Sequence, residues 1–169
     1  RILIIDQTRL PGTTEIIALK TGEEIWNAIY LLQVRGAPAI GVAAAFGIYL
    51  LAKQIKTEDY DEFLEVFRQQ KEYLNSARPT AVNLSWALNR MERVCIQKKE
   101  SSVSDILQAL KEEAIEMKCE DIRVCKAIGE YGLTLVKPGD GILTHCNAGQ
   151  LATCRYGTAT APIYLGQER

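Results

Sequence analysis

The chain has 169 residues, of which 47% are hydrophobic and 24% charged, so its composition is that of a globular protein able to bury a sizeable core. Its 20 Lys and Arg residues nearly balance its 21 Asp and Glu residues, and no basic stripe carries interleaved aromatic side chains, which excludes nucleic acid as a partner. Five cysteines without a CxxC pair, with one histidine, argue against a disulfide framework and a zinc site and favour reduced thiols in the cytoplasm.

Two short strands and a first helix are predicted at the start of the chain. Residues 2–5 and 15–19 are apolar runs of strand length, and the Pro11-Gly12 pair between them is a turn signal. The opening run is too short for a secretory signal. Thr21 and Glu24 have the spacing of a capping box, so a helix is expected to begin there. Its buried face is expected to carry Ile25, Ala28, Ile29 and Leu32.

Residues 38–53 are predicted to form the central helix. This segment is apolar almost all round and rich in small side chains, which let neighbouring elements approach closely. The uncharged stretch from Gly36 to Ala52 approaches the length of a membrane span, but its glycines and proline and the flanking Arg35 and Lys53 favour a buried core helix. We therefore expect no membrane partner.

Three or four amphipathic helices are predicted to pack around this central helix. Apolar residues recur at helical spacing over residues 60–74, 84–95 and 107–117. A fourth set, over 124–135, is expected to continue the third helix after a break near Glu120. Apolar faces of this kind indicate a helical domain.

The composition changes at the turn signal Lys137-Pro138-Gly139-Asp140. Residues 141–146 are predicted to form a buried strand, followed by a glycine-containing loop and a helix from Leu151 onward. A strand, a loop and a helix in this order are typical of the first unit of an α/β domain. One strand and one helix do not complete such a domain. We therefore expect an α+β chain that divides into a mainly helical domain with a small β-sheet, residues 1–137, and the truncated start of an α/β domain, residues 138–169.

Arg35-Gly36-Ala37-Pro38 is the first candidate binding site. A glycine allows close approach to the backbone, Pro38 suits the first turn of a helix, and the free N–H groups of that turn attract anions. Arg35 adds a cation that binds phosphate through two hydrogen bonds. The same residues also fit a plain turn between two helices with an exposed arginine.

Cys146 is the candidate catalytic residue. It stands at the carboxyl end of the predicted strand, where open α/β folds bind ligands, and the positive end of the following helix is expected to lower the pKa of its thiol. Such a thiolate acts as a nucleophile or general base, whereas the alternative is a small buried hydrophobe. His145 is not expected to form a dyad with it, because adjacent residues on a strand point to opposite faces.

Arg78 is a further candidate for an anion or a sugar hydroxyl, because Pro79 biases it to an extended backbone at the mouth of a helix. The pattern alone fits a surface arginine equally well. Arg155 and Tyr156 are expected to be structural. The same expectation holds for the four cysteines on predicted helices, which are Cys95, Cys119, Cys125 and Cys154.

Several short motifs together resemble one family. They are Arg35-Gly36-Ala37-Pro38-Ala39-Ile40-Gly41, Arg78-Pro79-Thr80-Ala81-Val82-Asn83-Leu84, Thr144-His145-Cys146-Asn147-Ala148-Gly149 and Tyr156-Gly157-Thr158-Ala159, after the opening Asp6-Gln7-Thr8-Arg9-Leu10-Pro11. In this order and at this spacing they resemble the methylthioribose-1-phosphate isomerases of methionine salvage. The resemblance covers essentially the whole chain.

The resemblance implies a mainly helical amino-terminal domain followed by a Rossmann-like domain. It implies a sugar phosphate substrate and the interconversion of 5-methylthioribose 1-phosphate and 5-methylthioribulose 1-phosphate. The family's phosphate and sugar contacts correspond to Arg35, Gly36, Ala37 and Arg78, and its active-site cysteine corresponds to Cys146. Hydrogen moves between C1 and C2 either by proton transfer through a phosphoenolate or by hydride shift.

The resemblance further implies a cytoplasmic homodimer that uses no metal and no organic cofactor. The family's catalytic aspartate lies in a carboxyl-terminal half beyond residue 169, so this chain alone is expected to be inactive. Thr160 is a minor departure, because it stands where an apolar residue is expected.

Two related classes are alternatives. Ribose-1,5-bisphosphate isomerases share the cysteine chemistry, but the Arg35–Gly41 and Arg78–Ala81 sequences argue against them. Regulatory subunits of the factor that exchanges guanine nucleotide on initiation factor two are binding proteins on a related scaffold without the reactive cysteine. Cys146 beside Asn147-Ala148-Gly149 favours the enzyme.

Overall fold

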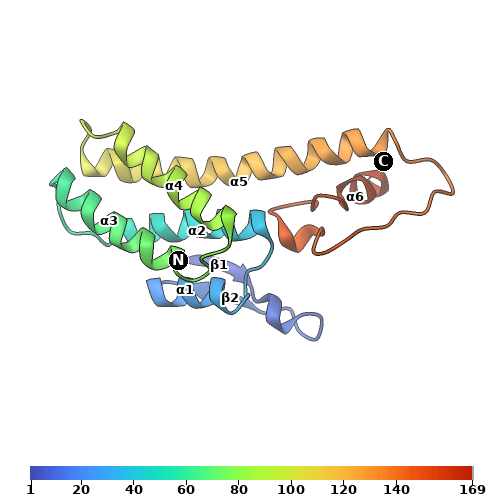
Figure 1. Cartoon of the computed structure of the whole chain (residues 1–169), viewed down its shortest axis with the longest axis horizontal. Helices are drawn as coiled ribbons and strands as arrows, with labels where there is room; N and C mark the ends of the chain where they lie inside the picture. The colour runs from blue at the N-terminus through green and yellow to red at the C-terminus, as the bar shows by residue number, and fades with distance from the viewer. Residues whose placement is uncertain (169) are drawn as a thin grey trace.

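The computed structural model describes residues 1–168, which form an elongated, mainly helical molecule with a small sheet on one side (Figure 1). The mainly helical part of the expected α+β architecture is confirmed, as is its small β-sheet. The strands are β1 (Ile2–Ile5) and β2 (Ile16–Leu19), and the helices are α1 (Gly22–Tyr30), α2 (Ala37–Ala52), α3 (Tyr60–Asn75), α4 (Val82–Gln97), α5 (Val103–Leu133) and α6 (Ala161–Gln167), with short 3-10 turns at Gln7–Arg9 and Gln150–Ala152.

The sheet and the start of the first helix form where the sequence predicts them. The prediction that Leu32 lies on the buried face of this helix is wrong, because α1 ends at Tyr30 and Leu32 is 37% exposed. β1 pairs with β2 antiparallel, with Ile2 opposite Leu19 and Ile5 opposite Ile16. At the start of α1, the Thr21 hydroxyl accepts a hydrogen bond from the Glu24 N–H (3.2 Å), and the Glu24 carboxylate accepts one from the Thr21 N–H (3.0 Å). This reciprocal pair satisfies N–H groups that the helix itself leaves free, and it confirms the predicted capping box.

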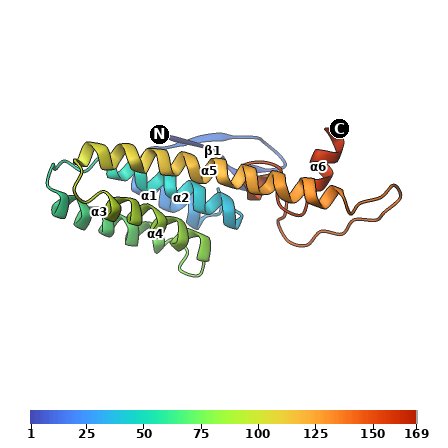
Figure 2. The ribbon, with the colours of Figure 1, turned by 90° about the horizontal axis from the view of Figure 1, so that it is seen from above.

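α2 is the central helix, as predicted, and lies among α1, α3, α4 and α5 (Figure 2). Small residues bring its neighbours close: a Cβ on Gly47 would lie 2.8 Å from Ile25 Cγ2, and one on Gly41 would lie 3.1 Å from the Asn83 carbonyl oxygen. A Cβ at either glycine would require its neighbour, the Ile25 side chain or the Asn83 backbone, to shift. Within residues 1–168, no helix is both long and apolar enough to cross a membrane.

α5 is one continuous helix, so the predicted break near Glu120 is wrong. Residues 118–123 contain neither proline nor glycine, and the Glu120 carboxylate accepts a hydrogen bond from Arg90 Nη1 (2.6 Å) on α4. The apolar pattern changes there because α5 leaves the main core and continues to a second one. That second cluster consists of Cys125, Tyr156, Ala161 and Leu165.

The carboxyl-terminal segment differs from its predicted form. Residues 141–146 are exposed and pair with no strand among residues 1–168, because the hydrogen-bonding partner that a β-strand requires is not there. The helix predicted from Leu151 is only a 3-10 turn at Gln150–Ala152, and α6 begins at Ala161. Cys154 therefore lies in a loop and not on a helix, which corrects its predicted placement.

Candidate active site

The amino terminus of α2 has no side-chain cap and lies directly after Arg35. Gly36, its N-cap, has φ +97°, a conformation that favours glycine, and no side chain caps the helix. Gly36 uses its carbonyl to accept the first helical hydrogen bond from Ile40 (2.9 Å). Pro38 has no N–H, so the N–H groups of Ala37 and Ala39 are the first-turn donors left for a ligand beside Arg35.

α4 begins in a similar way. Its N-cap is Ala81, and no side chain caps this helix either. The Ala81 N–H donates to the Arg78 carbonyl (2.9 Å), which places Arg78 at the mouth of the helix as its position before Pro79 predicts. Two uncapped helix termini, each beside an arginine, are a favourable setting for a phosphate group.

Cys146 lies where the extended carboxyl-terminal segment turns. Its φ of +61° is in the left-handed region, which non-glycine residues enter rarely and which recurs at functional sites. The side chain is exposed among residues 1–168. Because no α-helix follows directly, the predicted helix dipole behind this thiol is absent within residues 1–168.

The Cys146 loop is held by turns that follow it. The Ala148 carbonyl accepts hydrogen bonds from the Thr158 N–H (2.9 Å) and from the Thr160 hydroxyl (2.9 Å). Farther along, the Asp121 carboxylate on α5 accepts one from the Cys154 N–H (2.6 Å). The loop is therefore tied both to itself and to α5.

One cavity of about 520 Å³ is lined by residues of the Arg35, Arg78 and Cys146 motifs. Its lining includes all five predicted site residues, which are Arg35, Gly36, Ala37, Arg78 and Cys146. Asn83, Asn147 and Thr158 add polar groups to the wall. His145 is not among the residues that line it. An adjoining hollow, also about 520 Å³, shares Arg35, Cys146 and Asn147 and adds Gln7, Leu10, Pro11 and Leu151.

The geometry also identifies residues that the sequence patterns did not single out. Asp6 is only 4% exposed, and its carboxylate accepts hydrogen bonds from the Thr8 hydroxyl (2.6 Å) and the Gln33 amide (2.9 Å). The Thr8 hydroxyl is the main cause that holds the pKa of Asp6 below its usual value, against the opposing effect of burial. The sequence feature that points to this segment is the resemblance of residues 6–11 to the family motif.

The other thiols differ from Cys146 in their surroundings. Burial raises the pKa of Cys95 and of Cys154 to about 12 in each case, and it also raises the pKa of Cys125. Arg155 stacks on the ring of Tyr156 (4.6 Å to the centroid), and neither lines the cavity. In the described part of the chain, no group of His, Cys, Asp or Glu side chains gathers to hold a metal ion.

Comparison with known proteins gives a family match and close relatives. The model of the Initiation factor 2 subunit family matches residues 33–163. The chain is 56% identical over 168 residues to a methylthioribose-1-phosphate isomerase of Symbiobacterium thermophilum, covering 99% of this chain and 47% of that protein. The corresponding protein of Parabacteroides distasonis is 58% identical, with 99% and 50% covered. A 5-deoxyribose 1-phosphate isomerase of Clostridium botulinum is 50% identical, with 100% and 48% covered.

Two solved structures resemble this one closely. The 5-methylthioribose 1-phosphate isomerase of Pyrococcus horikoshii matches with a TM-score of 0.89 and 39% identity, over 98% of this chain and 47% of that one. The delta subunit of translation initiation factor eIF-2B from A. fulgidus matches with a TM-score of 0.87 and 38% identity, over 99% and 49%. The chain spans about half the length of the relatives it matches. The resemblance seen in the motifs is thereby confirmed.

Proposed function

The chain belongs to the Initiation factor 2 subunit family, and we propose from this premise that the protein is an isomerase that interconverts 5-methylthioribose 1-phosphate and 5-methylthioribulose 1-phosphate in methionine salvage. The observation that carries the proposal is the single cavity lined by Arg35, Arg78 and Cys146. The relatives named as isomerases of sugar 1-phosphates support the same reaction class.

The substrate's phosphate is assigned to the amino terminus of α2. The guanidinium of Arg35 and the free N–H groups of the first turn are donors suited to phosphate oxygens. Arg78, across the same cavity, is assigned to the phosphate or to a sugar hydroxyl. Because the phosphate is esterified at C1, fixing it also fixes the carbon at which the reaction occurs.

Cys146 is assigned to the reacting carbons. In the proton-transfer course, the ring opens, a proton leaves C2, and a proton is returned to C1, so that the aldose becomes a ketose. The thiol removes or relays this proton, with a carboxylic acid outside the present chain as its partner. An exposed thiol in the wall of the phosphate cavity is suitably located for this transfer.

A regulatory role is the second candidate, since the delta subunit of initiation factor eIF-2B shares the fold at similar identity. Fold alone does not separate the two, because one scaffold hosts both catalysis and binding. Cys146 with the Asn147-Ala148-Gly149 loop favours the enzyme. The reaction class also accommodates 5-deoxyribose 1-phosphate, which keeps the phosphate at C1 and differs only at C5.

The wider architecture belongs to the same proposal. We assign residues 1–137 to a helical domain and residues 138–169 to the start of a Rossmann-like domain. The exposed side chains of Ile142 (51%) and Leu143 (96%) support this division, because apolar residues of a sheet strand are exposed until neighbouring strands cover them. We also propose that the protein is a homodimer in the cytoplasm.

The test is Cys146→Ser in the full-length protein. We expect isomerisation to fall by about three orders of magnitude or more with folding unchanged, because a hydroxyl replaces the ionisable thiol. Cys119→Ser is the matched control, since Cys119 is a half-buried thiol on α5 outside the cavity. Turnover at the unaltered rate in Cys146→Ser would overturn the role of the thiol. A wild-type protein without isomerase activity would favour the regulatory role.

A further inference from the structure

The segment after β1 contacts both loops of the candidate active site. The backbone N–H of Gln7 donates to the carbonyl of Gln33 (2.9 Å), two residues before Arg35. The side-chain Nε2 of Gln7 donates to the carbonyl of Leu151 (2.9 Å), in the loop that begins at Cys146. A single residue thus joins the Arg35 loop to the Cys146 loop, which are far apart in sequence.

Asp6 holds the backbone of Gln7 against Gln33, close to Arg35. One carboxylate oxygen of Asp6 accepts hydrogen bonds from the N–H (3.0 Å) and the hydroxyl (2.6 Å) of Thr8, and the other accepts one from the Gln33 amide (2.9 Å). With Asp6 buried and fully partnered, the 3-10 turn that carries Gln7 is held against Gln33. The backbone from which the Gln7 side chain extends is therefore held in place.

The two loops also touch directly beside this hydrogen bond. A Cβ on Gly36 would lie 2.6 Å from the Cβ of Ala152, the residue after Leu151. The Gly36 backbone therefore packs directly on Ala152, which prevents the loops from approaching further but does not prevent them from separating. The hydrogen bond from Gln7 opposes separation, and Gln7 borders the adjoining hollow together with Arg35 and Cys146.

We infer that Gln7 is a positioning residue, which holds the Cys146 loop at a set distance from the phosphate-binding loop around Arg35. The reaction needs this distance, because the phosphate fixes C1 and the thiol must meet the neighbouring carbon. A displacement of about 1 Å in such a geometry lowers a rate by about 100-fold. The inference rests on the proposed function for the reason that this distance matters and for its kinetic measurement.

The first experiment is Gln7→Glu in the full-length protein. The change keeps the length of the side chain but places a carboxylate oxygen against the Leu151 carbonyl, so the loops lose their bridge. We expect kcat to fall by about 10- to 100-fold, while KM and inhibition by inorganic phosphate change by less than about threefold, since Arg35 and α2 are untouched. Gln54→Glu is the matched control, because the Gln54 amide also donates to a backbone carbonyl, that of Lys20 (3.4 Å), away from the cavity.

The second measurement is the rate at which iodoacetamide alkylates Cys146, followed by peptide mass spectrometry. We expect Gln7→Glu to change this rate by about threefold or more and Gln54→Glu to leave it unchanged. A merely structural role would lower the amount of folded protein without altering kcat or alkylation of the folded fraction, and that result would overturn the inference. Unaltered kcat and alkylation in Gln7→Glu would overturn it too. An inactive wild type would instead refute the proposed function, and alkylation would still decide the role of Gln7.

Discussion

Gly36 is constrained both by its backbone conformation and by the close contact with Ala152. Its φ of +97° is strained for any L side chain, and a Cβ there would collide with Ala152. We expect Gly36→Ala to lower the free energy of unfolding by about 1–3 kcal/mol, as measured by urea denaturation. Gly141→Ala is the control, because a Cβ at Gly141 meets nothing within 4 Å and its φ is not positive. Equal stability of the two variants would contradict the constraint.

Asp6 makes the stability of the chain depend on pH in a defined direction. Its hydrogen bonds to Thr8 and Gln33 lower the pKa of the folded-state carboxyl from the ordinary 3.8. A group with a depressed folded pKa stabilises the fold fully above its unfolded pKa, and this stabilisation is lost as the pH falls through the folded pKa. We therefore expect Asp6→Asn to be less stable than the unaltered chain at pH 7, with a difference that shrinks below about pH 3.8. Urea denaturation at several pH values measures it, and a difference independent of pH would refute it.

The residues of the site were predictable to different degrees. Arg35, Arg78 and Cys146 stand in recognisable motifs, and the cavity brings them together as that resemblance implies. The contacts of Asp6 and Gln7 were not predictable, because Gln7 meets Leu151 across 144 positions of sequence and no local pattern encodes such a pairing. The left-handed backbone of Cys146 was equally unpredictable, since nothing in its residue type favours it.

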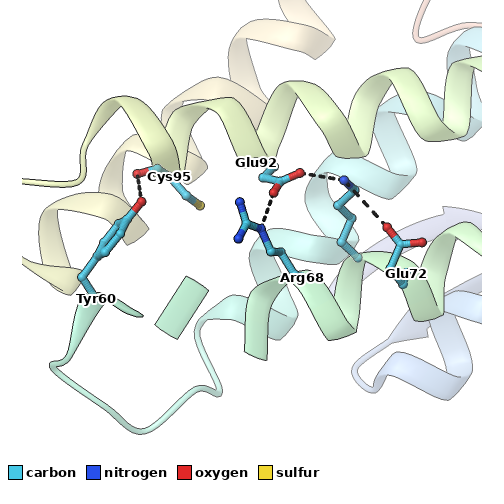
Figure 3. A network of polar contacts seen from close by, with 6 residues as sticks. Tyr60, Arg68, Glu72, Glu92 and Cys95 are labelled. Atoms are coloured by element: carbon cyan, nitrogen blue, oxygen red, sulfur yellow. Dashed lines mark hydrogen bonds and ion pairs between the residues drawn. The ribbon is translucent and has the colours of Figure 1, made fainter. Parts of the chain in front are cut away.

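Between α3 and α4, a charged network joins the two helices at a partly buried seam (Figure 3). The Glu92 carboxylate accepts hydrogen bonds from Arg68 Nε and Lys71 Nζ, each at 2.6 Å, and the side chains of Glu92 and Lys71 are only 15% and 13% exposed. Burial raises the pKa of Glu92, but the bonds from Lys71 and Arg68 outweigh it, so the pKa lies below its usual value. The charged form of Glu92 is therefore the one that joins the helices.

We expect Glu92→Gln to lower the free energy of unfolding by about 1–3 kcal/mol, because Lys71 loses its charged partner in a poorly hydrated position. Glu72→Gln serves as the control. Glu72 lies 3.8 Å from the same Lys71, but its side chain is 69% exposed, so its removal is expected to change stability by less than about 0.5 kcal/mol. A similar loss in both variants would show that solvent exposure does not decide the strength of these pairs.

At the scale of the elements, helices were predictable and the carboxyl-terminal segment was not. Apolar periodicity marks α3 and α4 because each buries one face against the same core, and the capping box marks the start of α1. The continuity of α5 was missed because its apolar face changes partner along its length, which interrupts the pattern without breaking the backbone. The strand predicted over residues 141–146 has the right composition but no neighbour to pair with among residues 1–168.

Residues 1–168 contain two separate hydrophobic clusters linked by α5. The main cluster surrounds α2 and reaches Met117 on α5, whereas the second contains Cys125 and three residues from the carboxyl-terminal segment, among them Leu165 on α6. In Figure 1, α5 extends past the bundle and α6 lies against its far half. The Cys146 loop is joined to the second cluster through Tyr156 and the turns around Ala148. Arg35 belongs to the side of the main cluster, so the cavity lies where the two parts meet.

This division predicts that the second cluster opens locally while the main core stays folded. Leu165→Ala removes a buried side chain (6% exposed) from the small second cluster, and Leu110→Ala removes one (0% exposed) from the main core. Each large-to-small change weakens its own cluster by about 2–5 kcal/mol. We expect Leu165→Ala to accelerate amide hydrogen exchange in residues 121–133 and 148–165 but not in α2, because local opening follows local contacts. Leu110→Ala is expected to accelerate exchange throughout, since all of these amides are exposed when the main core unfolds. Uniform acceleration by Leu165→Ala would show instead that the two clusters unfold as one unit.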